Sequence, residues 1–169
     1  MWLKLIGAVC IVTACGGGGV LAAQKLQQRV ALLRQLEQGL SLLAGEIDYG
    51  ATPLAQALQQ AGAALEGQAA ALFLQTAAEL SQPQGTTAEQ AWRHGLASGV
   101  WQPEDEDILR RLGQGLGLSG RNDQLKRLDS ARRQLAENCR QAQEQAAGYG
   151  KIWRSLGWGG GLILALFLF

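Results

Sequence analysis

The sequence has little of what catalytic centres, disulfide-bonded folds and β-sheets need. Of 169 residues, one is histidine, three are cysteine and three are proline, and aromatic residues make up 6%. The cysteines lack the spacing of a metal site, and their odd number argues against a disulfide framework. The few prolines, beside abundant Ala, Leu and Gln, favour helices over a β-sandwich. The composition therefore predicts an all-α protein without cofactor or metal.

Charge is also scarce and nearly balanced. Charged residues make up 17% of the chain, against about 25% in soluble domains. The formal net charge is +1, which provides no long-range field to attract nucleic acid. Aromatic residues do not alternate with the bases, as single-strand binding would require. We therefore expect no nucleic-acid partner.

The charges that are present avoid both ends of the chain. All 14 acidic residues and 14 of the 15 basic residues lie within residues 24–154. Residues 5–23 are uncharged and mostly apolar, and as a helix they are long enough to cross a hydrocarbon layer of about 30 Å. Residues 155–169 are apolar too, but shorter, so they need local bilayer thinning or neighbouring residues to span. The pattern predicts membrane segments at 1–23 and 155–169 around a cytoplasmic helical bundle at 24–154.

Basic residues next to the two apolar ends predict the orientation. Bases beside a span favour the cytoplasmic side, and here they lie on the 24–154 side: Lys25, Arg29, Arg34, Arg140, Lys151 and Arg154. Both apolar ends are rich in glycine, and small residues let membrane helices approach closely. The glycines that we expect at such contacts are Gly16, Gly19, Gly157 and Gly161. The alternative is that they only fill space in lone anchors.

A second interpretation of the N-terminus starts from Cys15. The residues Val12-Thr13-Ala14-Cys15 resemble a bacterial lipobox, in which the cysteine is lipidated and becomes the mature N-terminus. The flanks fit poorly, because one lysine precedes the motif and a further apolar run follows it. An uncleaved span is the preferred interpretation, and a lipidated envelope adaptor with an extracytoplasmic helical domain is the alternative.

Helical periodicity fills the middle of the chain. A coiled-coil-like seam with spacings of three and four ends at Tyr49-Gly50, and its members are Leu26, Val30, Leu33, Leu36, Leu40, Leu43 and Ile47. Shorter helices are expected at 53–62, with Thr52 as N-cap and Pro53 at the first position, and at 66–80. Thr86 and Glu89 match a capping box that opens the next helix.

The remaining helices complete the predicted architecture. One is expected to begin at Pro103 and to end near 113–117, and the last to begin near 120 and to continue into the C-terminal apolar segment. The chain thus predicts a membrane-tethered bundle of about six helices. Its two long helices run antiparallel, and each is continuous with a membrane segment.

No motif of the sequence points to catalysis. Residues 115–120 match G-x-G-x-x-G, but the dinucleotide fingerprint needs a preceding strand and the preceding segment is helical. The acids at 104–107 suit the positive end of a helix dipole, and four consecutive side chains cannot converge on one metal ion. His94 fits a surface or half-buried imidazole. If the protein serves an energy-consuming machine, another subunit hydrolyses the nucleotide.

One block of the sequence is more specific. Residues 46–54, EIDYGATPL, resemble the E-I-x-Y-G-x-T-P-L block of the stage III sporulation protein AB family. Weaker agreement extends over the chain, at residues 3–8, around Trp92, at 116–119 and at 151–157. Gly120 departs from the acidic residue expected there.

The resemblance implies a non-enzymatic protein in the mother-cell membrane around the forespore. It implies a soluble domain similar to the helical domain of type II secretion F-type platform proteins, within a secretion-like channel complex. The partners implied are a cytoplasmic ATPase (stage III sporulation protein AA), the polytopic membrane subunits of the complex, and lipid. The family block and the basic residues supply the candidate partner-binding residues: Glu46, Tyr49, Gly50, Thr52, Pro53, Leu54, Arg110, Arg111 and Arg121.

Each part of this set has a plain structural alternative. The block at 46–54 could be a helix–turn–helix corner, and buried Tyr49 and Leu54 would favour that interpretation. The bases could form a solvated helix face instead of a docking surface for an acidic partner or lipid headgroups.

Overall fold

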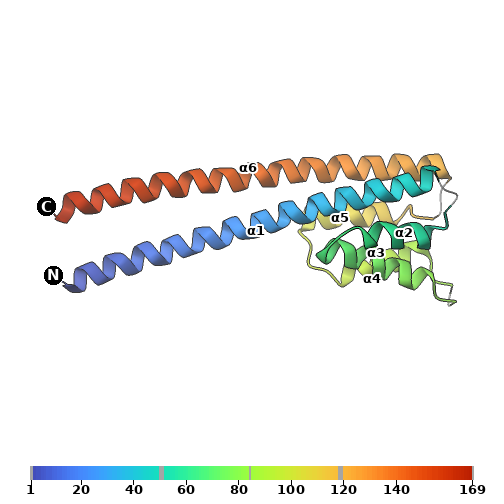
Figure 1. Ribbon diagram of the computed structural model, residues 1–169, viewed down its shortest axis with the longest axis horizontal. Coiled ribbons are helices and arrows are strands. Elements are labelled where there is room, and N and C mark those ends of the chain that lie inside the picture. Colours follow the sequence, from blue (N-terminus) through green and yellow to red (C-terminus); the bar gives the residue numbers. More distant parts are fainter. Residues whose placement is uncertain (1, 50–51, 84, 118–119, 169) are drawn as a thin grey trace. The chain divides into compact units, whose positions relative to one another are not determined.

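A computed structural model describes residues 2–49, 52–83, 85–117 and 120–168, with side chains described only between residues 24 and 148. Within this part the chain forms six helices, shown in Figure 1: α1 Trp2–Tyr49, α2 Leu54–Ala63, α3 Gly67–Leu80, α4 Ala88–Ala97, α5 Pro103–Gly113 and α6 Arg121–Leu168. The predicted all-α class, the number of helices and the two long helices are confirmed.

The chain divides into two compact units. We call Ala31–Cys139 the core unit, and Met1–Val30 with Arg140–Phe169 the terminal unit. In the core unit α2 packs on α3, α3 on α4 and α4 on α5. Short links make successive helices antiparallel. At one end of the core unit, α1, α3 and α5 finish and α2, α4 and α6 begin (Figure 1). We call this the turn end.

The predicted leucine seam of α1 lies in the core. Leu33, Leu36, Leu40 and Leu43 are each at most 1% exposed. Side chains from each of the other five helices complete this core. The largest are Leu58, Leu72, Phe73, Trp92, Leu109, Leu128 and Leu135. The rings of Phe73 and Trp92 meet edge to face, with centroids 5.5 Å apart, which is a favoured geometry for aromatic pairs.

Two glycines allow close helix packing around these rings. A Cβ on Gly39 of α1 would lie 2.6 Å from Leu65 Cδ1 and 2.9 Å from Phe73 Cζ, and one on Gly113 of α5 would lie 2.4 Å from Trp92 Cδ1. The buried Trp92 indole N–H donates to the Leu109 carbonyl of α5 at 2.8 Å. Trp92 is therefore held by packing and by a hydrogen bond.

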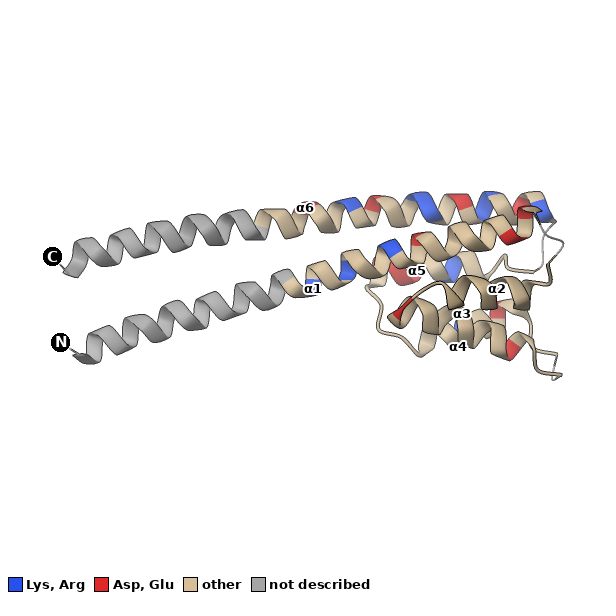
Figure 2. Cartoon of the chain, viewed as in Figure 1, with Lys and Arg blue, Asp and Glu red and all other residues tan. Residues whose placement is uncertain are grey.

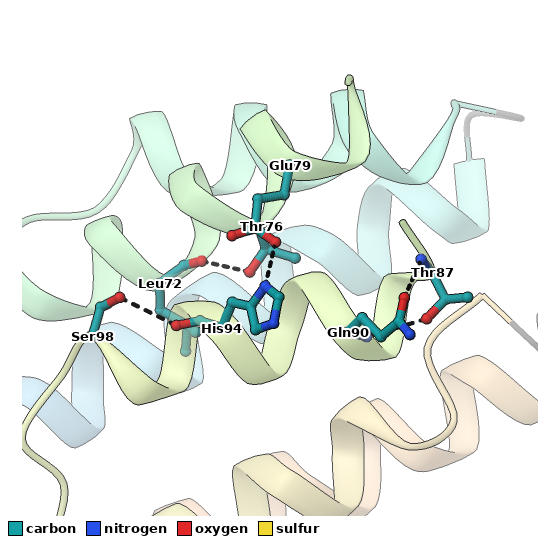
Figure 3. Close-up of polar contacts among 7 residues, drawn as sticks. All are labelled: Leu72, Thr76, Glu79, Thr87, Gln90, His94 and Ser98. Atoms are coloured by element: carbon teal, nitrogen blue, oxygen red, sulfur yellow. Dashed lines mark hydrogen bonds and ion pairs between the residues drawn. The ribbon is translucent and has the colours of Figure 1, made fainter. Parts of the chain in front are cut away.

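Two predicted helix starts are wrong by one residue. The capping box of α4 uses Thr87 and Gln90, not Thr86 and Glu89, as the close-up in Figure 3 shows. Both pairs match the capping-box pattern, and the backbone places Thr87 at the N-cap. At α2 the N-cap is Pro53 and the helix begins at Leu54. Thr52 is not that cap, because its hydroxyl is turned back toward α1.

The terminal unit continues the two long helices. Its described side chains include half-buried Leu26 and Val30 and buried Ala142. No helix carries an apolar stretch of membrane-crossing length within residues 24–148, where side chains are described. The predicted segments 1–23 and 155–169 lie outside that part. So do their members Cys15, Gly16, Gly19, Gly157 and Gly161.

Candidate functional site

The corner between α1 and α2 is held by the first residue of the family block. Glu46 is half-buried, and its Oε2 accepts a hydrogen bond from the Thr52 hydroxyl at 3.3 Å. With the Gln60 amide oriented to donate, its nitrogen lies 2.9 Å and 3.1 Å from the two carboxylate oxygens of Glu46. Glu46 thus joins the last turn of α1 to the link and to α2. This contact assigns Glu46 and Thr52 a structural role.

The turn end also brings together segments that are far apart in sequence. Arg121, at the start of α6, donates through Nη2 to the Asp48 carbonyl and to its carboxylate, the latter at 2.7 Å. A cation at the C-terminal end of α1 is also favoured by the helix dipole. Arg121, predicted as a candidate partner-binding residue, therefore ties α6 to α1.

A glycine turn completes this end of the core unit. Gly117, in the link between α5 and α6, has φ of +77°, and a Cβ there would lie 3.1 Å from Ala88 and 3.6 Å from Leu54. Its positive φ suits glycine, as expected for a turn following a helix. The predicted turn within the G-x-G-x-x-G stretch is observed at Gly117, which lies close to Leu54 of the block at 46–54.

One residue of the block does not serve the corner. Tyr49 is 93% exposed, whereas Leu54 is half-buried against this turn and Pro53 is exposed. Gly50 lies outside the described residues. The structural interpretation of the block therefore applies to Glu46, Thr52 and Leu54, which build the corner. The partner-binding interpretation remains for Tyr49, whose aromatic ring is exposed. A tyrosine pairs a large apolar body with a polar tip, a combination typical of protein interfaces.

The basic residues of α5 and α6 are mostly paired with acids of the same helix. Five exposed arginines lie one turn from a carboxylate partner: Arg110 with Glu106, Arg111 with Asp107, Arg127 with Asp123, Arg133 with Asp129 and Arg140 with Glu144. Figure 2 shows the signs alternating along α6. Such pairs each contribute about 0.3–0.5 kcal/mol. This arrangement favours the solvated face for most of these bases.

The acids at 104–107 open α5 as predicted, but one of them is buried. α5 begins at Pro103, and Asp105 is 3% exposed. Asn138 of α6 donates to its Oδ1 at 2.7 Å. This contact could not be predicted from the sequence, because nothing local distinguishes Asp105 from its neighbours. In the part of the chain with described side chains, no three His, Cys, Asp or Glu residues are grouped as a metal ion requires.

The single histidine bridges α3 and α4 at the surface. His94 is exposed as predicted, and its Nδ1 lies 3.0 Å from Glu79 Oε2 (Figure 3). Beneath it, buried Thr76 donates to the Leu72 carbonyl at 2.7 Å. The first contact links α3 to α4, and the second satisfies the Thr76 hydroxyl within α3.

Comparison with known proteins shows which family the chain belongs to. The family model described as stage III sporulation protein AB matches residues 4–169. The chain belongs to the stage III sporulation protein AB family. It is 33% identical to stage III sporulation protein AB of Bacillus subtilis (strain 168), over 98% of this chain and 99% of that one. A solved structure of stage III sporulation protein AB (SpoIIIAB) is similar with a TM-score of 0.65 and 27% identity, over 71% of this chain and 97% of that one.

Membership in the stage III sporulation protein AB family confirms the resemblance that began at residues 46–54. It identifies the chain as a sporulation protein. The solved relative also supports the helical fold. Within this family member, the block at 46–54 combines a hydrogen-bonded corner with one exposed ring, so the site to test is the turn end around Tyr49.

The corner contact makes a quantitative prediction. Glu46→Ala and Gln60→Ala are each expected to lower the free energy of unfolding by about 1 kcal/mol, because each removes one side of a charge-assisted hydrogen bond. In a double-mutant cycle the two changes should couple by about 0.5–1.5 kcal/mol. Denaturant unfolding followed by far-UV circular dichroism measures all three variants. Coupling below about 0.3 kcal/mol would show that the two side chains act independently.

Proposed function

We propose that this family member is a non-enzymatic platform subunit of the sporulation channel complex between mother cell and forespore. In this role residues 1–23 and 155–169 lie in the mother-cell membrane, and the core unit docks the cytoplasmic ATPase on the cytoplasmic side. The protein positions that ATPase against the membrane components and carries out no reaction itself. Family membership and the charge asymmetry of the sequence support the proposal.

The observation that carries the docking role is the exposure of Tyr49. Its side chain is 93% exposed, although it lies in the block at 46–54 that resembles the family, and although Glu46 and Thr52 of the same block are used in the corner. A tyrosine has only two side-chain torsions to order on binding, so an exposed tyrosine ring suits an interface anchor. Within the core unit, α1 ends and α6 begins at the turn end, so the chain does not connect the core unit to the terminal unit there.

The test is the affinity of the full chain, held in lipid nanodiscs, for the purified cognate ATPase. Tyr49→Ala is expected to weaken binding by about 30-fold, the loss of about 2 kcal/mol typical of a hot-spot aromatic. Val100→Ala is the matched control, because Val100 is 87% exposed in the α4–α5 link at the opposite end of the core unit. It should change affinity by less than about twofold.

The stability of each variant separates docking from folding. Tyr49 makes few contacts within the chain, so Tyr49→Ala should leave the unfolding transition within about 0.5 kcal/mol of wild type. Equal losses of affinity for Tyr49→Ala and Val100→Ala, or no binding by the wild-type chain, would contradict the proposal.

A further inference from the structure

A groove lies between α4 and α5 that the proposed function does not use. It has a volume of about 140 Å³, and Trp92, Leu96 and Gly113 line it together with the charged side chains of Glu89, Arg93 and Arg110. A space near 150 Å³ is large enough to admit a benzene ring. The groove can therefore accept one large apolar side chain.

The floor of the groove is rigid. Trp92 packs so closely on α5 that a Cβ on Gly113 would lie 2.4 Å from its Cδ1, and its indole N–H donates to the Leu109 carbonyl at 2.8 Å. A preformed site does not have to be ordered on binding, so the conformational entropy cost of binding a ligand is smaller.

The rim carries two guanidinium groups from different helices. Arg110 of α5 is paired with Glu106 at 2.5 Å. Arg93 of α4 is exposed and has no acidic partner among the described residues. Glu89 stands one turn before Arg93 but does not pair with it in this part of the chain, whereas the same spacing forms ion pairs on α5 and α6. Among the described residues, Arg93 is thus a cation at the edge of an apolar recess and forms no ion pair, although Glu89 lines the same groove.

We propose that this groove docks a segment of a partner protein that carries a large apolar side chain flanked by carboxylates. The apolar side chain would fill the recess over Trp92, and a carboxylate would pair with Arg93. Guanidinium groups bind carboxylates through paired hydrogen bonds. A lipid surface fits less well, because the recess admits a single apolar side chain.

This inference goes beyond the proposed function, since Tyr49 does not line the groove. The two proposals can therefore be contradicted separately. The effect of Tyr49→Ala on ATPase binding does not test the groove, and the effect of Arg93→Glu on probe binding does not test docking through Tyr49.

A defined probe tests the groove. The probe is a fluorescein-labelled peptide of about 14 residues with one Phe flanked on both sides by Asp and Glu, and fluorescence anisotropy follows its binding to the full chain in zwitterionic nanodiscs. Arg93→Glu is expected to weaken binding at least about tenfold, and Arg93→Gln by less. Replacing the Phe of the probe with Ala should also weaken binding about tenfold, and added salt should weaken it further.

Lys126→Glu is the matched control. Lys126 is an exposed cation of α6 without an acidic partner among the described residues, so its reversal changes net charge equally but leaves the groove intact. It should alter affinity by less than about twofold, and circular dichroism should show all variants folded. Equal losses for Arg93→Glu and Lys126→Glu, equal binding of a probe with Lys in place of its acids, or no saturable binding would overturn the proposal. Self-association abolished by Arg93→Glu would assign the groove to a second copy, and would also overturn it.

Discussion

Replacing Trp92 with alanine is expected to lower the free energy of unfolding by about 3–5 kcal/mol, the usual range for removing a buried aromatic side chain. Trp92 is 1% exposed, stacks edge to face on Phe73 and donates to the Leu109 carbonyl. The change removes all three contributions and leaves a cavity between α4 and α5. Guanidinium unfolding of the full chain in mild detergent, followed by far-UV circular dichroism, measures the loss.

Trp101→Ala is the matched control for Trp92→Ala. The Trp101 indole N–H also donates to a carbonyl, that of Leu96, at 2.8 Å, but the side chain is half-buried in the α4–α5 link. The same chemical change there should cost about 1–2 kcal/mol, because less apolar surface is involved. A Trp92→Ala variant no less stable than Trp101→Ala would show that Trp92 is not central to the core.

Two glycines of α1 should respond to substitution in opposite directions. Gly39→Val is expected to destabilise the fold by about 2–3 kcal/mol, since even a Cβ at Gly39 would lie 2.6 Å from Leu65 and 2.9 Å from the buried Phe73 ring. Gly45→Ala is expected to stabilise it by about 0.5–1 kcal/mol, because a Cβ there meets nothing within 4 Å and alanine is the better helix former.

The same denaturant series measures both glycine variants, and each serves as the control for the other within one helix. Helix propensity alone favours Gly39→Val slightly as well as Gly45→Ala, so only close packing predicts opposite signs. Stabilisation by Gly39→Val would mean that α1 does not approach the Phe73 ring as described.

The sequence was sufficient where the signal is local and periodic. Leu33, Leu36, Leu40 and Leu43 follow the three–four spacing of a helix face, and all four are buried. The start of α4 shows the limit of such patterns. Thr86 with Glu89 and Thr87 with Gln90 both satisfy the capping-box pattern, and only the backbone conformation decides for Thr87. Local patterns therefore identify a helix start but leave its register open by one residue.

The contacts between helices could not be predicted, at the turn end or elsewhere in the core unit, because their partners are distant in sequence. The block at 46–54 stood out, but neither the bond of Arg121 to Asp48 nor that of Asn138 to Asp105 has a local signature. Gly39 likewise lies among the leucines of the seam without a local signature. Its role in close packing depends on the position of Phe73. The sequence located the candidate site, and three-dimensional packing separated its exposed residue from its structural ones.

The order in which the helices pack has a consequence for synthesis of the protein. Contacts between α2 and α3, α3 and α4, and α4 and α5 join neighbours along the chain, and closing such short loops costs little entropy. These helices can therefore associate while the chain is still emerging from the ribosome. The bridge from Arg121 to Asp48 spans 73 residues and must wait for α6. A partner whose binding requires the Arg121–Asp48 contact in place would consequently bind only molecules whose sixth helix has been made.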